Sequence, residues 1–186
     1  MAEYAMRALR GRAGLVTSAI AISMSLFHIV YVVFIPMMTQ LLRGIHLAFA
    51  LALVLLLYPL KGSRRGEPFS PKSSDVLDVA LVFLVVFLTA YYVIGFEKFI
   101  ERAIVPTTMD LIFGVVIIIL TLEIARRTVG PILSLIAILF LSYLFIGRWL
   151  PPPLGLRGYD LARTVGHLAM TLEGIYGIPI GVCATY

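Results

Sequence analysis

The side chains most able to take part in chemistry in this sequence are a few charged residues and histidines set among long apolar stretches. Glu123 precedes Arg126 and Arg127 by three and four residues, so a helix would place all three on one face. Such a cluster forms an ion pair at a membrane surface. It then either holds a helix end against a partner or binds a lipid phosphate through the arginine fork. The alternative interpretation is a simple anchor at the cytoplasmic end of a helix.

A second group of polar residues lies near the start of the chain. Arg43 and His46 are three residues apart at the head of an apolar stretch, where we expect His46 to anchor a helix end. His28 is the only ionisable group deep in the preceding apolar stretch. An ionisable residue at that depth is a functional hypothesis by default. A neutral histidine that is hydrogen-bonded to a neighbouring helix is the alternative.

The familiar signatures of catalysis are missing from the sequence. It contains no HExxH, GxSxG or GxxxxGK[ST] motif, and its three histidines are scattered over different segments. The single cysteine, Cys183, excludes an internal disulfide and a cysteine-based zinc site. Thr107 and Asp110 have the spacing of a capping box, which explains a carboxylate beside an apolar run without an ion site. We therefore predict a protein that is not an enzyme and holds no cofactor or metal.

Composition indicates the environment, water or lipid, in which the chain folds. Of its 186 residues, 61% are hydrophobic and 13% charged, whereas a soluble domain has about 45–50% and about 25%. This excludes a soluble globule and predicts an all-α integral membrane protein whose main partner is the lipid bilayer. The net charge of +5 is spread over several short stretches, so it indicates membrane topology and predicts no nucleic-acid partner.

Intervals without charged residues delimit the expected helices, because a charge at the bilayer centre costs several kcal/mol. They predict five spans, at about Leu15–Met38, Gly44–Leu60, Val79–Phe96, Asp110–Glu123 and Thr128–Gly147. The first is too long for the apolar core of a signal peptide. The fourth crosses only if Asp110 lies at one interface while Arg126 and Arg127 reach the other.

A partial sixth helix is expected in the apolar tail, Leu168–Tyr186. Three glycines and Pro179 fall within Gly174–Gly181, so this helix should be broken. The break is either unwound backbone at membrane depth, as transporters use near ions and substrates, or a loop at the membrane edge. No flanking charge follows the tail, and we expect the reading frame to be incomplete.

Orientation follows from the lysines and arginines of alternate connections. Nine lie on the side of the N-terminus and six on the other, which predicts a cytoplasmic N-terminus. The Gly62–Ser74 stretch is then a cytoplasmic linker. Glu97–Arg102 is expected to form a short amphipathic helix on the outer surface. The outer side also carries three further polar residues, Arg157, Asp160 and Arg163.

Three stretches carry a resemblance to a known family. They are 43–49 (RGIHLAF) leading to Tyr58-Pro59, 122–130 (LEIARRTVG), and 173–182 (EGIYGIPIGV) followed by 184–186 (ATY). Together, and in this order, they resemble the fused permeases of tripartite ATP-independent periplasmic (TRAP) transporters, particularly the TAXI-type branch.

The resemblance implies that residues 1–163 are the small (Q) scaffold portion and residues 164–186 the start of the large (M) transport portion. It implies sodium-coupled import of organic acids, such as dicarboxylates or amino acids, across the bacterial inner membrane. A periplasmic solute-binding protein would deliver the substrate. The sodium and substrate sites of the family belong to the remainder of the large portion, so no ion or substrate residue is assigned here.

The residues kept as candidates are therefore structural. Arg43, His46, Glu123, Arg126 and Arg127 are expected at helix junctions or interfaces, and Arg157, Asp160 and Arg163 are expected to meet the binding protein. A free-standing helical membrane module with a structural or assembly role is the alternative. An intramembrane enzyme is the poorest hypothesis, because His28, Asp110 and Glu123 fall at different depths.

Overall fold

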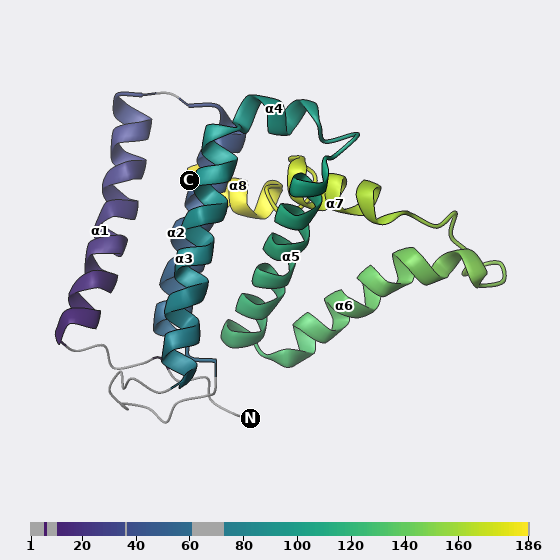
Figure 1. The fold of residues 1–186 in the computed structure, drawn as a ribbon, viewed down its shortest axis with the longest axis horizontal. Helices are drawn as coiled ribbons and strands as arrows, with labels where there is room; N and C mark the ends of the chain where they lie inside the picture. Colours follow the sequence, from purple (N-terminus) through teal and green to yellow (C-terminus); the bar gives the residue numbers. More distant parts are fainter. Residues whose placement is uncertain (1–5, 7–10, 36, 61–72, 186) are drawn as a thin grey trace. The chain divides into compact units, whose positions relative to one another are not determined.

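The computed structural model of this chain describes residues 6, 11–35, 37–60 and 73–185 (Figure 1). Every regular element within these ranges is helical. The helices are α1 (Gly11–Val33), α2 (Thr39–Leu57), α3 (Ser73–Ile94), α4 (Phe96–Glu101), α5 (Thr108–Thr128), α6 (Pro131–Ile146), the short 3₁₀ helix η1 (Gly147–Trp149), α7 (Leu161–Met170) and α8 (Ile178–Thr185). The predicted all-α class is confirmed for the described part of the chain.

Five of these helices are long and apolar enough to cross a bilayer. They are α1, α2, α3, α5 and α6, the last continued by η1, and they provide candidate spans of 19 to 21 residues. Large apolar side chains point outward from them; Phe83 is 70% exposed and Leu139 is 68% exposed. Exposed apolar surface of this extent is expected only where lipid or another protein covers it. The five helices indicate a multi-pass membrane protein.

The helix bounds differ from the charge-free intervals at several ends. α1 ends at Val33, before the predicted Met38, and α2 already begins at Thr39, so Arg43 lies inside that helix. α3 begins at Ser73 and includes Asp78, which is fully buried. Charged residues delimit the apolar core of a span, but a helix continues wherever its backbone hydrogen bonds are made and the charged side chain finds partners.

The fourth span shows the same effect most clearly. α5 has 21 residues although the charge-free interval has only twelve. Thr107 is its N-cap, with the predicted capping box: the Thr107 side chain accepts from the Asp110 backbone, and the Asp110 carboxylate accepts from the Thr107 backbone. Glycine and proline separate α5 from α6, because Gly130 has φ of 113° and Pro131 occupies the first turn of α6. The fifth span therefore begins later than the predicted Thr128.

Glu97–Arg102 was expected to form a short helix, and α4 is that helix. Its aromatic residues pack inward, however: Phe99 is fully buried, and its ring lies edge-on to Phe113 with centroids 5.0 Å apart. Ile100 is exposed. The location of α4 on the outer surface stays a prediction.

The tail contains the expected helix break. α7 ends at Met170 and α8 begins at Ile178, so Gly174 and Gly177 lie in the connection while Gly181 lies inside α8. α7 begins at Leu161, earlier than the predicted Leu168. At Gly174 any Cβ would overlap the backbone of Leu168, so only glycine fits this turn.

The described residues form two compact units, divided at Phe96 and Tyr176. The first unit contains α1, α2, α3 and α8, with α2 packed against the other three. Its core includes Leu42, Leu51, Leu55, Val85 and Tyr92. The second unit spans Glu97–Ile175, where α5 packs against α6 and α7 around Phe99, Phe113, Ile117, Val165 and Ala169. The predicted division at residue 163 concerns the two family portions and stays a prediction.

Candidate functional site

Arg43 connects the second span to the tail within the first unit. Its Nη1 donates to the carbonyl oxygen of Tyr176 at 3.0 Å and to that of Gly177 at 3.3 Å, more than 130 residues along the chain. Gly181, one turn into α8, lies so close to the guanidinium that a Cβ there would overlap it. The Arg43 Nε is buried and has no hydrogen-bond partner among the described residues. A charged donor thus fixes the carbonyl groups at the start of α8.

Tyr92 of α3 completes this arrangement. Its hydroxyl donates to the carbonyl oxygen of Gln40 at 2.9 Å, and its ring stacks on Tyr176 with centroids 5.4 Å apart and planes at 16°. Gly44 lies against the other side of the network, where a Cβ would overlap the Tyr92 ring. We call Gln40, Arg43, Gly44, Tyr92, Tyr176, Gly177 and Gly181 the Arg43 junction. It joins three helices of the first unit through buried aromatic and polar contacts.

His46 does not anchor a helix end, because it lies in the third turn of α2, where it meets His28 of α1. The Nδ1 of His46 is 2.9 Å from the Nε2 of His28, and the Nδ1 of His28 is 2.7 Å from the carbonyl oxygen of Met24. A carbonyl only accepts, so the His28 Nδ1 carries a proton; in neutral His28 the Nε2 then accepts from the His46 Nδ1–H. The interpretation of His28 as hydrogen-bonded to a neighbouring helix agrees with this geometry.

The cluster of Glu123, Arg126 and Arg127 forms as its spacing predicts, in the second unit. Arg126 donates through Nε and Nη2 to the two carboxylate oxygens of Glu123, each at 2.8 Å. Arg127 donates through Nε to Glu123 Oε1 at 2.7 Å, and its side chain is only 1% exposed. Both arms of the Arg126 fork are therefore used within the chain. This arrangement favours a brace at the end of α5 over a phosphate-binding fork.

A second ion pair lies at the opposite end of α5. Asp110, fully buried, accepts from Arg102 Nε at 2.8 Å and from Arg102 Nη2 at 3.0 Å. The Thr107 hydroxyl adds a 2.6 Å hydrogen bond to the same carboxylate. Arg102 was not among the sequence candidates. The only signal in the sequence is an arginine eight residues before a carboxylate, across a turn that contains Pro106.

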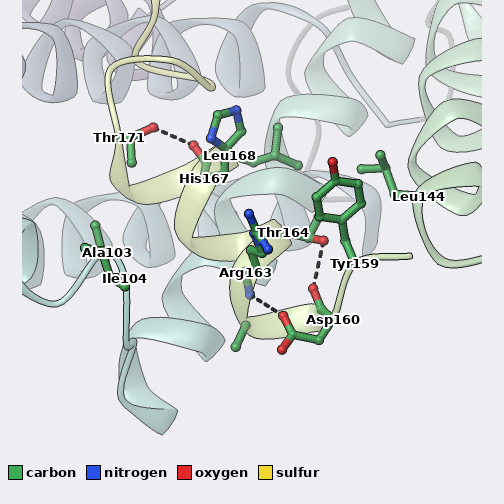
Figure 2. Close-up of a pocket in the computed structure, with 11 residues that line it drawn as sticks. Ala103, Ile104, Leu144, Tyr159, Asp160, Arg163, Thr164, His167, Leu168 and Thr171 are labelled. Carbon is green, nitrogen blue, oxygen red and sulfur yellow. Dashed lines mark hydrogen bonds between the residues drawn. The ribbon is translucent and has the colours of Figure 1, made fainter. Parts of the chain in front are cut away.

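The three outer-face candidates also lie together. Arg157, Asp160 and Arg163 line one hollow, with Arg148 as a fourth polar residue that the sequence did not single out. Asp160 is the N-cap of α7, where its Oδ1 accepts from the Arg163 backbone N–H at 2.7 Å. Figure 2 shows Tyr159, Asp160 and Arg163 at the edge of an adjoining, larger hollow.

The remaining chemistry of the described residues is sparse. No group of three or more histidine, cysteine or acidic side chains within them is arranged to hold a metal ion. His167 and Glu173 form an exposed pair at 3.5 Å, separate from the clusters above. Comparison of the chain with protein-family models, curated proteins and solved structures finds no match. Function must therefore be argued from the clusters themselves.

Proposed function

We propose that this chain is the scaffold portion of a secondary, sodium-coupled permease of the TRAP type. In this proposal it lies in the bacterial inner membrane with a cytoplasmic N-terminus. The complete permease imports organic acids of the dicarboxylate or amino-acid type. A periplasmic solute-binding protein delivers them, and residues 164–186 begin the large transport portion. Transport itself then requires the large portion, and this chain contributes no catalysis.

The Arg43 junction is the observation that supports this proposal. Arg43 belongs to the first stretch that resembles the family, and its acceptors, Tyr176 and Gly177, belong to the third. A scaffold must contact the moving portion of a transporter at a defined point. A guanidinium that donates to two backbone carbonyl oxygens makes such a contact without a flexible side chain on the partner.

The second unit supports the same scaffold role, because its ion pairs make it rigid. Ion pairs brace both ends of α5, at Asp110 and at Glu123, and neither leaves a carboxylate free to bind a cation.

Uptake measurements in the source cells test the proposal. We would delete the locus and measure uptake of labelled succinate and glutamate with and without a sodium gradient. The proposal predicts loss of sodium-dependent uptake of at least one organic acid and its recovery with the intact locus. Arg43→Gln in the complete gene should not restore uptake, whereas Lys98→Gln, which removes an exposed charge outside the junction, should.

Two results would overturn it. One is sodium-dependent organic-acid uptake that is unchanged by the deletion. The other is a stop codon directly after the codon for Tyr186, with no gene for a binding protein or a large apolar protein nearby. The second result favours the free-standing membrane module.

A further inference from the structure

A small basic hollow lies at the end of α6, in the second unit. It has a volume of about 290 Å³ and is lined by Arg148, Arg157, Gly158, Tyr159, Asp160 and Arg163. Three of these six residues carry a guanidinium and one a carboxylate, so the lining has a formal charge of +2 (three minus one). We call this the basic hollow.

The loop after α6 is folded so that its arginines meet. The Leu156 backbone N–H donates to the carbonyl oxygen of Gly147 at 2.9 Å, and that of Tyr159 donates to Leu144 at 3.2 Å. Gly158 has φ of +74°, and a Cβ there would press on the Arg148 side chain at 3.0 Å. These contacts return the chain onto the end of α6 and place Arg157 and Arg163 around the same space as Arg148.

The positive charge of the basic hollow is not neutralised by the described residues. None of its three guanidinium groups has a hydrogen bond or an ion pair within the described ranges; Arg148 lies 4.1 Å from the Trp149 ring centre and Arg163 lies 5.4 Å from that of Tyr159. Asp160 is engaged as the N-cap of α7. Three arginines without a carboxylate partner among the described residues, two of them beside an aromatic ring, favour an anionic ligand, and a phosphate group matches the guanidinium fork.

A larger, mostly apolar hollow adjoins the basic one. It has a volume of about 800 Å³ and shares Tyr159, Asp160 and Arg163 with its neighbour. Figure 2 shows Ala103 and Ile104 on one side of it and Leu144 and Tyr159 on the other, with Arg163 between them. Leu168 and Ala162 add further apolar surface. A free phosphate ion gains nothing from such a surface, whereas an acyl chain does.

We propose that these two hollows form a binding site for one anionic phospholipid. The phosphate lies in the basic hollow and an acyl chain lies along the larger hollow. The location agrees with a membrane interface, since the apolar span formed by α6 and η1 ends at Trp149, and tryptophan and tyrosine concentrate at headgroup level. This proposal does not depend on the transport function proposed above, because it concerns the second unit and the bilayer alone.

The single tryptophan provides a direct test. Trp149 is the only tryptophan in the chain and lies beside Arg148 of the basic hollow. We would purify the full chain in an uncharged detergent and add phosphatidylglycerol with brominated acyl chains, because bromine quenches tryptophan fluorescence at short range. Phosphatidylcholine with the same brominated chains supplies the headgroup control. Inorganic phosphate, added as a competitor, separates a lipid site from a site for the free ion.

Three variants make the test specific. Arg157→Gln/Arg163→Gln should weaken quenching by phosphatidylglycerol roughly thirty-fold in apparent affinity, because each arginine near an anionic lipid contributes a factor of about five. Arg157→Gln alone should weaken it about fivefold. Lys98→Gln removes an exposed charge outside the hollow and should change the affinity by no more than about twofold in physiological salt. Circular dichroism checks that each variant keeps its helical content. If the double variant unfolds, the lipid affinity of the folded Arg157→Gln variant tests the proposal.

The expected result is quenching by phosphatidylglycerol at lower concentration than by phosphatidylcholine. This preference is weakened in the arginine variants by the factors given above and is unaffected by millimolar phosphate. Equal quenching by the two lipids would overturn the proposal. So would unchanged phosphatidylglycerol quenching in the folded arginine variants. If inorganic phosphate at the concentration of the lipid abolished quenching by phosphatidylglycerol, the basic hollow would be a site for the free ion instead.

Discussion

The two compact units use arginine in different ways. In the first unit, Arg43 donates to backbone carbonyl oxygens that lie 133 and 134 residues away in sequence. In the second unit, Arg102, Arg126 and Arg127 donate to carboxylates that lie eight, three and four residues away. The first arrangement joins distant segments of the chain, whereas the second braces the ends of one helix. A long-range bond to backbone needs no matching carboxylate, so the sequence offers no partner that would reveal it.

The two arrangements also predict different losses of stability when the arginine is replaced. A buried charged group, such as the Asp110 carboxylate or the Arg127 guanidinium, becomes uncompensated when its partner is lost, which costs about 3–5 kcal/mol. A carbonyl that loses a charged donor is a neutral group and leaves no unpaired carboxylate, so the expected cost is lower, about 1.5–3 kcal/mol. The second unit should therefore respond to arginine loss by unfolding, and the first by release of its tail.

Arg102→Gln should have the largest effect on the free energy of unfolding. It leaves the fully buried Asp110 carboxylate without its bidentate partner, and we expect a loss of about 4 kcal/mol. Unfolding in mixed micelles with rising sodium dodecyl sulfate, followed by circular dichroism, measures it. The double variant Arg102→Gln/Asp110→Asn should recover part of the loss, because no unpaired charge remains. Strict additivity of the two single changes would show that the pair does not couple.

Glu123→Gln should follow, with a loss of about 3 kcal/mol in the same assay. It removes the carboxylate that faces Arg127, whose side chain is 1% exposed. Arg126→Gln is the matched control: its side chain is 36% exposed, so its loss should cost less than about 1 kcal/mol. A larger effect for Arg126 than for Glu123 would contradict the role of Glu123 as the partner of the buried Arg127.

The smallest effect is expected at the histidine pair. His46→Leu removes the donor to His28 Nε2 and should lower the free energy of unfolding by about 1 kcal/mol. His167→Leu, which changes an exposed histidine of the second unit, should have no measurable effect. Equal losses in the two variants would mean that the contact between His28 and His46 does not contribute to stability.

The sequence predicted the parts of this molecule that depend on local spacing. The capping box of Thr107 and Asp110, the cluster of Glu123 with its two arginines and the break between α7 and α8 all follow from residues within a few positions of each other. The five apolar spans follow from the spacing of charged residues along the chain. Long-range pairing was not predictable, because the acceptors of Arg43 are backbone atoms and any residue supplies those.

Helix bounds were less predictable for a related reason. α2 begins before Arg43 and α3 includes Asp78, because these charged side chains find partners inside the fold. The pair of His28 and His46 was missed because their separation of 18 residues carries no periodic signal between two different helices. The grouping of Arg148 with Arg157 and Arg163 depends on how the loop after α6 returns, which glycine at position 158 permits.

Hydrogen exchange in the tail tests most directly the claim that Arg43 holds the start of α8. The measurement compares the wild-type chain in lipid nanodiscs with Arg43→Gln and with the control Arg126→Gln, following the amides of residues 176–185 by mass spectrometry. We predict exchange at least about tenfold faster in Arg43→Gln, which corresponds to the loss of about 1.5 kcal/mol of local stability, and no change in Arg126→Gln. Unchanged exchange of this segment in Arg43→Gln would contradict the account.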